Sequence, residues 1–223
     1  MRIVVLLGAP GAGKGTQAHV LARHLALPRI ATGDLFRTAV REGTALGAEA
    51  RTYMDRGELV PDGITIRMLL ERLAAPDAAR GAILDGFPRT RSQAEALDAA
   101  LDERSVRVEA ALLIDVPVVD LFSRLSGRWL CAAAGHPYHE TADPPRVAGV
   151  CDVDGSPLVQ RDDDRPDVVR ARLDGQLGAL GEVVDHYRAA GLLWTVDGRL
   201  SIAGVSAALL DAIEPAPWWR RTS

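Results

Sequence analysis

Short apolar runs alternate with segments of helical periodicity along most of the chain. The runs are continuous and rich in β-branched residues, which is typical of strands buried on both faces of a parallel sheet. They predict strands at residues 3–7, 29–31, 82–84, 110–116 and 192–196. Apolar residues at helical spacing predict helices at residues 17–27, 35–42, 62–73, 90–101, 118–125, 166–190 and 201–213. This alternation predicts an α/β fold with a doubly wound, five-stranded parallel sheet and right-handed crossovers.

Glycine, proline and a potential capping residue refine the predicted ends of these helices. Gly43 and Gly57 bracket a further predicted helix. Asp62 is expected to be the N-cap of the helix that runs to Leu73. Pro166 suits the first turn of its helix, where a missing backbone N–H does no harm.

Two segments depart from this alternation. Residues 128–164 contain prolines, glycines, both cysteines and two histidines, with few long apolar runs, and predict a small insert of short strands and turns. Residues 214–223, with Trp218 and Trp219, suggest no function, and we expect a docked or frayed terminus there.

Composition narrows the class of protein. A chain of 223 residues can bury one large core with a small subdomain. The net charge of -4 argues against non-specific binding to nucleic acid, which requires a basic surface. Two cysteines imply no disulfide framework. The apolar run at residues 1–7 is too short for a secretion signal, and no segment is long enough to span a bilayer, so we expect a cytosolic protein without membrane partners.

A glycine-rich loop joins the first predicted strand to the first helix. It runs from Gly8 to Thr16, and its Lys14 is the one lysine among 26 basic residues. A helix N-terminus attracts phosphate, glycines let the backbone wrap around it, and a lysine reaches the β and γ groups. The spacing fits the Walker A pattern except at Gly15, where that pattern has Ser or Thr. The loop predicts nucleoside triphosphate binding, against the plainer alternative of a strand-to-helix turn.

The loop's Gly-Lys-Gly-Thr wording resembles the nucleoside monophosphate kinases, and three further segments narrow the resemblance to the adenylate kinase family. These segments are residues 31–37 (Ala-Thr-Gly-Asp-Leu-Phe-Arg), residues 85–90 (Asp-Gly-Phe-Pro-Arg-Thr) with Gln93, and Gly127-Arg128 with residues 160–164. The resemblance runs in register from residue 1 to about 213. It implies a monomer with a P-loop NTPase-type core at residues 1–30, 61–126 and 165–223. An AMP-binding helical region is expected at residues 31–60 and a lid of the long bacterial form at residues 127–164.

The resemblance also assigns roles by position. The implied catalytic residues are Lys14, Asp85, Arg89, Arg124, Arg128, Arg161 and Arg172. The implied ATP contacts are Gly11, Ala12, Gly13, Lys14, Gly15, Thr16, Arg128, Pro137, Tyr138 and Leu200. The implied AMP contacts are Thr32, Arg37, Glu58, Leu59, Val60, Gly86, Phe87, Pro88, Arg89, Gln93, Arg161 and Arg172. Arginine suits these positions because its planar fork binds phosphate oxygens in pairs.

Magnesium and the acceptor base depend on single positions. Asp85 is expected to hold Mg²⁺ through water, because Gly15 supplies no hydroxyl; a turn or helix-capping aspartate is the alternative. Thr32 and Gln93 match positions where family members recognise adenine, and relatives that accept pyrimidine nucleotides tend to have alanine in place of Thr32. The alternative for Thr32 is a cap of the following helix.

A structural zinc site in the lid is only partly present. Family members hold zinc with two pairs of ligands, and here Cys131, Cys151 and Asp154 match three of the four positions. The fourth is Ala134, which cannot bind a metal. His136 lies two residues further on and would substitute only if the loop geometry changed. Two cytosolic thiols without a metal are the alternative.

The resemblance implies reversible, magnesium-dependent transfer of a phosphoryl group from ATP to AMP, giving two ADP. Two other functions stay open. One is a kinase for CMP, UMP or GMP, and the other is a sensor that binds ATP and AMP without turnover.

Overall fold

The computed structural model describes residues 1–56 and 58–213. The predictions for Gly57 and for the tail with Trp218 and Trp219 lie outside the described residues. Among the residues described, no helix combines the length and the apolar character needed to cross a membrane.

Five parallel strands form the central sheet, in the order β2-β3-β1-β4-β8. Their bounds are Arg2–Leu7 (β1), Arg29–Ala31 (β2), Gly81–Asp85 (β3), Val108–Asp115 (β4) and Leu193–Asp197 (β8). All five predicted strands are confirmed, and no end is shifted by more than two residues. Leu6 of β1 pairs with Asp85 of β3, which in turn pairs with Ala31 of β2. Asp85 therefore lies at the carboxyl edge of the sheet, where ligands bind in open α/β folds.

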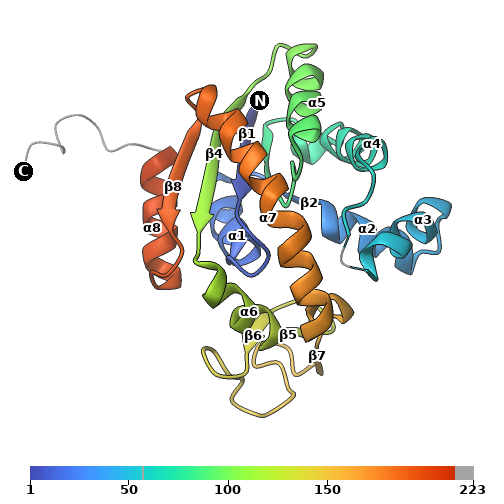
Figure 1. Cartoon of the computed structure of the whole chain (residues 1–223), viewed down its shortest axis with the longest axis vertical. Coiled ribbons are helices and arrows are strands. Elements are labelled where there is room, and N and C mark those ends of the chain that lie inside the picture. The colour runs from blue at the N-terminus through green and yellow to red at the C-terminus, as the bar shows by residue number, and fades with distance from the viewer. Residues whose placement is uncertain (57, 214–223) are drawn as a thin grey trace, which may run out of the picture.

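Among the described residues there are eight α-helices, most of which pack around the sheet (Figure 1). Their bounds are Lys14–Leu25 (α1), Thr32–Arg41 (α2), Ala45–Met54 (α3), Asp62–Leu73 (α4), Arg91–Asp102 (α5), Val118–Ser126 (α6), Pro166–Ala189 (α7) and Ile202–Ile213 (α8). Each corresponds to a predicted helix. The helix α1 begins three residues before its prediction, because its first turn belongs to the polar loop and carries no apolar period. Two 3₁₀ turns, Pro76–Ala78 and Asp162–Asp164, were not predicted.

The prediction for Asp62 is wrong. Pro61 is the N-cap of α4, no side chain caps that helix, and Asp62 is its first helical residue. Its carboxylate is instead directed at α5, where it accepts hydrogen bonds from Gln93 Nε2 at 2.6 Å and Thr90 Oγ1 at 3.1 Å. Asp62 thus joins α4 to α5 through long-range partners that local sequence does not reveal.

A hydrophobic cluster covers each face of the sheet. Val4 and Leu6 of β1 belong to one cluster, together with apolar residues of α1, α6 and α8. Ile3 and Val5 belong to the other, together with apolar residues of α4, α5 and α7. Alternate residues of a strand point to opposite faces, so this division is the one expected of a doubly wound fold.

The insert between α6 and α7 forms a small antiparallel sheet, in the order β6-β5-β7. Its strands are Arg128–Cys131 (β5), Pro137–His139 (β6) and Leu158–Val159 (β7). We call residues 127–164 the lid. The lid lies at one end of the central sheet, and α2 and α3 stand out on another side of it (Figure 1). The prediction that the insert consists of short strands is confirmed. The exact boundaries of the core, the AMP-binding region and the lid stay predictions.

Candidate active site

The loop between β1 and α1 is shaped by glycines in the left-handed region. Gly11 has φ 83° and Gly13 has φ 95°. A Cβ at Gly11 would lie 2.9 Å from Leu125 Cγ and 3.0 Å from Leu121 O, so α6 packs directly on the loop. Gly13 is the N-cap of α1, and no side chain caps that helix. The N-terminal N–H groups of α1 are therefore available for an anion.

Lys14 is partly buried at the start of α1, with its ammonium directed back into the loop. Nζ donates to Gly8 O at 2.7 Å and to Ala9 O at 2.9 Å. Burial is the main cause that lowers the pKa of Lys14 to about 7; Asp85 opposes this shift and nearby arginines add to it. The site therefore disfavours further positive charge, and a bound polyanion would stabilise the charges already there.

A cavity of about 270 Å³ opens beside the loop. The carboxyl ends of the central strands, the lid and α7 contribute to its lining. All six arginines that the resemblance assigns to phosphate line it: Arg37, Arg89, Arg124, Arg128, Arg161 and Arg172. They come from five different parts of the chain, and only the fold brings them together. Six guanidinium groups around one cavity favour a ligand with several phosphates.

A buried carboxylate orients two of these arginines. Asp164 is fully buried; it accepts from Arg128 Nε at 2.8 Å and from Arg172 NH1 at 3.2 Å. It thereby ties the lid strand β5 to α7. Sequence reasoning did not assign this role to Asp164. The cluster of acidic residues at 162–164, directly before a helix, was the available signal.

Asp85 also lines the cavity, and its carboxylate is engaged by an arginine that sequence reasoning missed. Arg29 donates to Asp85 Oδ2 from Nε at 3.0 Å and from NH2 at 2.7 Å. The remaining nitrogen, NH1, donates to Asp34 Oδ2 at 2.6 Å, and Asp34 also accepts from Arg37. Burial would raise the pKa of Asp34, but Arg37 and Arg29 together lower it to about 2. An unbroken row of alternating charges therefore runs from Asp85 to Arg37.

A smaller cavity of about 50 Å³ adjoins the main one at Gly86 and Arg89. Its lining includes the predicted acceptor-base residues Thr32, Glu58, Leu59, Val60 and Gln93. Thr32 Oγ1 donates to Gly86 O at 3.0 Å. Because Ala31 is the N-cap of α2 and no side chain caps that helix, the alternative role of Thr32 as a helix cap is wrong.

Gln93 has hydrogen-bond partners on both sides of its amide. Oε1 accepts from Arg89 N at 2.8 Å, and Nε2 donates to Asp62 at 2.6 Å. Gln93 is also almost fully buried. These contacts fix the orientation of the amide and hold it against Arg89, the arginine shared by the two cavities.

Some of the predicted nucleotide contacts lie outside these two cavities. Ala12 and Phe87 are buried in the core and line neither cavity. The Tyr138 hydroxyl is directed into the lid core, where it accepts from Asp152 N at 2.7 Å, and Leu200 is half exposed to solvent. Pro88 lines a further small cavity beside Lys14 and Arg89, and the remaining predicted contacts line the two cavities described above. Predicted roles for these side chains stay predictions.

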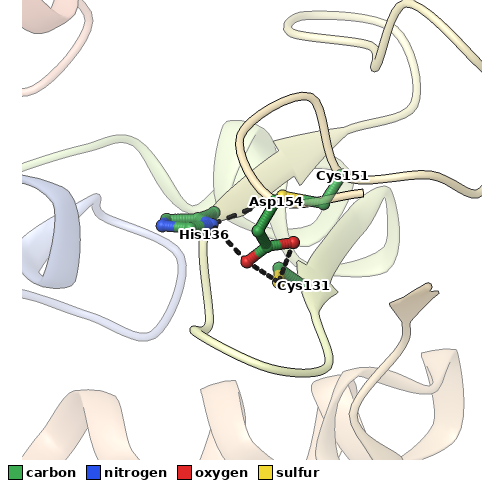
Figure 2. Close-up of side chains that lie close together, drawn as sticks. All are labelled: Cys131, His136, Cys151 and Asp154. Carbon is green, nitrogen blue, oxygen red and sulfur yellow. Dashed lines mark hydrogen bonds and ion pairs between the residues drawn. The ribbon is translucent and has the colours of Figure 1, made fainter. Parts of the chain in front are cut away.

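The lid holds a cluster of four potential metal ligands (Figure 2). These are Cys131, His136, Cys151 and Asp154, whose ligand atoms all lie within 4.8 Å of one another. His136 Nδ1 is 3.3 Å from Cys151 Sγ and 3.5 Å from Asp154 Oδ2. Ala134 contributes only a backbone N–H, 3.3 Å from Cys131 Sγ. His136 therefore lies beside the other three side chains, in place of Ala134, as a potential fourth ligand.

Hydrogen bonds around this cluster favour deprotonated ligands. Burial raises the pKa of Cys151, yet hydrogen bonds from Tyr138 and from backbone N–H groups lower it overall. A backbone hydrogen bond from Ser156, followed by the Cys131 thiol, holds the pKa of Asp154 well below its usual range.

Together, a phosphate loop at the carboxyl edge of a parallel sheet and a ring of arginines define a P-loop phosphotransferase. The family model described as "Adenylate kinase" matches residues 6–192. An adenylate kinase of Staphylococcus aureus (strain Mu50) is 44% identical over 211 residues, covering 95% of this chain and 98% of the relative. One from Streptomyces griseus is 47% identical over 212 residues, covering 95% and 97%. The chain belongs to the adenylate kinase family.

Proposed function

We propose that this chain transfers the γ-phosphoryl group of ATP to AMP, reversibly, to give two ADP. The observation that carries this proposal is the joining of two cavities at Arg89 and Gly86. The larger cavity has the phosphate loop and the arginines, and the smaller one has polar groups at its edges, as an acceptor-base pocket requires. A donor and an acceptor bound in these two places would meet at their phosphates.

The chain's own groups supply positioning and charge. The loop, Lys14 and the N-terminus of α1 hold the donor phosphates. Arg37 and Arg89 hold the phosphate of the acceptor. Arg128, Arg161 and Arg172 approach the transferred group from the lid side. Phosphoryl transfer requires alignment of the reactants and stabilisation of charge more than covalent chemistry. This set of residues provides both.

The donor set near the loop fits magnesium. Asp85 offers a nearly buried carboxylate, and a Cβ at Gly15 would lie only 3.8 Å from its Oδ2, so the loop backbone lies against it. Magnesium favours one or two carboxylates together with phosphates and water, which is what this edge provides. The bound ion neutralises charge on the phosphates of ATP. Asp85 and the loop are the groups that would hold it.

Adenine is the acceptor base that the smaller cavity favours. Thr32 is fixed against Gly86, and Gln93 is fixed between Arg89 and Asp62, so the polar groups at its edges have defined directions. A base that leaves such a buried polar group unpaired loses about 1–3 kcal/mol. Two unpaired groups of this kind would separate AMP from CMP, UMP and GMP by more than tenfold.

A panel of acceptors tests class and base choice together. ADP formation from ATP and magnesium is followed with AMP, CMP, UMP or GMP as acceptor. We expect rapid turnover with AMP and at least tenfold lower kcat/KM with the others. Preference for another acceptor would make the chain a different nucleoside monophosphate kinase. Binding of ATP and AMP without turnover would make it a sensor.

We also propose that the lid cluster binds one zinc ion. With zinc–sulfur bonds near 2.3 Å and zinc–nitrogen or oxygen bonds near 2.0–2.1 Å, a tetrahedral site has ligand atoms roughly 3.3–3.8 Å apart. The His136–Cys151 and His136–Asp154 separations of 3.3 and 3.5 Å lie in this range. Two thiolates, one imidazole and one carboxylate also form a donor set that suits zinc.

Metal analysis tests this site. We expect about one zinc per chain in protein purified without chelator, and well below half of that in His136→Ala. His139→Ala is the matched control, because His139 ends β6, three residues after His136, and lies outside the cluster. The double variant His136→Ala with Ala134→Cys should recover zinc. Zinc content unchanged in His136→Ala would contradict His136 as a ligand. A monomeric state and a cytosolic location stay predictions.

A further inference from the structure

Arg29 links the two sides of the candidate site. It donates two hydrogen bonds to Asp85, which lines the main cavity, and one to Asp34. Asp34 in turn accepts from Arg37, which lines the same cavity. One guanidinium is therefore shared by two carboxylates, and one of those carboxylates is shared by two guanidinium groups.

Arg29 itself does not line the main cavity. Its side chain is 20% exposed and that of Asp85 is 8% exposed. It lies on the edge strand β2 and lines a separate cavity of about 340 Å³ together with Arg72. Its side-chain hydrogen bonds go to Asp85 and Asp34, so we treat it as a positioning residue that acts through these two carboxylates.

We propose that Arg29 couples magnesium binding at Asp85 to AMP binding at Arg37, an inference that rests on the proposed function. The phosphate of AMP draws Arg37 away from Asp34. Asp34, left with one partner, attracts Arg29 more strongly, and Arg29 loosens its hold on Asp85. The Asp85 carboxylate then becomes available to the cation.

The same row of charges acts in the opposite direction. A magnesium ion at Asp85 repels Arg29 toward Asp34, and Asp34 then needs Arg37 less. Arg37 is thereby freed for the phosphate of AMP. Such coupling is reciprocal by thermodynamic necessity, and it has the same magnitude whichever ligand binds first. In the absence of AMP, Arg29 also keeps a positive charge against the metal carboxylate, which disfavours the cation.

A purely structural role for Arg29 makes a different prediction. In that case the ion pairs would only fasten the edge strand β2 to β3, where Arg29 pairs with Ile83. Loss of Arg29 would lower the melting temperature and would weaken AMP binding equally with and without magnesium. The metal dependence of AMP affinity is thus the readout that separates coupling from simple fastening.

Calorimetric titration of AMP tests the coupling without turnover. The protein is saturated with a non-hydrolysable ATP analogue, and the AMP dissociation constant is measured with magnesium and in magnesium-free buffer without chelator, so that any zinc in the lid cluster is retained. In the native chain we expect magnesium to tighten AMP by about fivefold or more, the lower end of typical coupling. In Arg29→Gln this ratio should fall at least threefold, because the bridge is gone. An unchanged ratio would overturn the proposal.

Two further variants serve as controls for this experiment. Arg72→Gln removes a similar two-bond pair, from Arg72 to Asp77, away from Asp85, and should keep the native ratio. Arg29→Lys keeps the charge, but a single ammonium cannot bond both carboxylates in the same way, so its ratio should fall as in Arg29→Gln. A native ratio in Arg29→Lys would show that the bridge is not needed and would overturn the proposal. This variant also serves if Arg29→Gln does not fold.

Failure of the coupling and failure of the proposed function give different results. If the native chain forms ADP from ATP and AMP but the ratio is the same in the native chain and Arg29→Gln, only the coupling is wrong. If the native chain binds no AMP and forms no ADP, the proposed function is wrong, and the proposed coupling is then wrong as well.

Discussion

The central sheet and the lid are stabilised in different ways. The sheet is covered by two hydrophobic clusters that reach across all five strands and most of the helices. The lid has strands of four, three and two residues around a buried cluster of Cys131, Tyr138, Cys151 and Leu158. Two of these four residues are also in the group of potential metal ligands.

This difference separates a core that is stable by itself from a lid that depends on polar contacts. Small units bury too little apolar surface to offset the entropy of folding, and many rely on a metal instead. The main cavity lies between the two regions and takes lining residues from both. We therefore expect changes in the core to act on chemistry and changes in the lid cluster to act on local order and ATP affinity.

The largest effect should come from Lys14, on the core side. Lys14→Met removes the point charge of the phosphate loop, and kcat for ADP formation should fall by about 10³-fold, as for other charge-stabilising groups. The melting temperature should stay the same or rise, because burial already disfavours the charged ammonium. A loss of activity that is matched by unfolding would contradict a role in chemistry.

Asp164 joins the two regions, so its removal should affect both. Asp164→Asn leaves Arg128 and Arg172 without their shared, fully buried carboxylate. Breaking a buried pair in this way costs about 3–5 kcal/mol. We expect a loss of this order in the free energy of unfolding, measured by urea denaturation. As a control, Asp77→Asn removes the partner of Arg72 at an exposed pair and should cost below about 1 kcal/mol. Equal losses in the two variants would contradict the junction role.

If the lid cluster holds zinc as proposed, removal of the zinc should affect the lid alone. After treatment with a strong chelator, amide hydrogen exchange in residues 128–159 should accelerate by at least about tenfold, since local opening no longer has to break ligand bonds. Exchange in β1, β3 and β4 should not change. Equal acceleration in the core strands would contradict separate stabilisation of the two regions.

The smallest effect should appear in the pH dependence of ATP binding. In the free protein the pKa of Lys14 is lowered to about 7, and bound phosphates favour its charged form. The ammonium is therefore present below pH 7 and is lost as the pH rises, so affinity should fall with rising pH. Between pH 7.0 and 8.0 we expect the dissociation constant of a magnesium-bound ATP analogue to rise by about fivefold. Lys14→Arg, which stays charged, should show no such rise, and a parallel rise there would contradict the assignment.

Features encoded by local pattern were predictable from the sequence. The strands were visible because most of their residues form short apolar runs, and the phosphate loop because glycine and lysine spacing is a local signal. The start of α1 was missed because its first turn carries no apolar residue. The six cavity arginines were found only through resemblance, since no local feature distinguishes them among 25 arginines.

Features that depend on long-range polar pairing were not predictable. Asp62 was taken for a cap because its partners, Thr90 and Gln93, lie 28 and 31 residues away. Arg29 and Asp164 draw their importance from partners brought near by the sheet and by α7. His136 could not be assigned to the metal group because the path of the loop after Cys131 decides whether its ring reaches Cys151.

The most direct test of the proposed activity follows the phosphoryl group itself. ATP labelled with ³²P in the γ position is mixed with unlabelled AMP, magnesium and the native chain, and the products are separated after a single turnover. Transfer to AMP predicts that the label appears in ADP, with almost none in inorganic phosphate. Label that stays in ATP, or that is released as inorganic phosphate at the same rate with and without AMP, would contradict the proposed function.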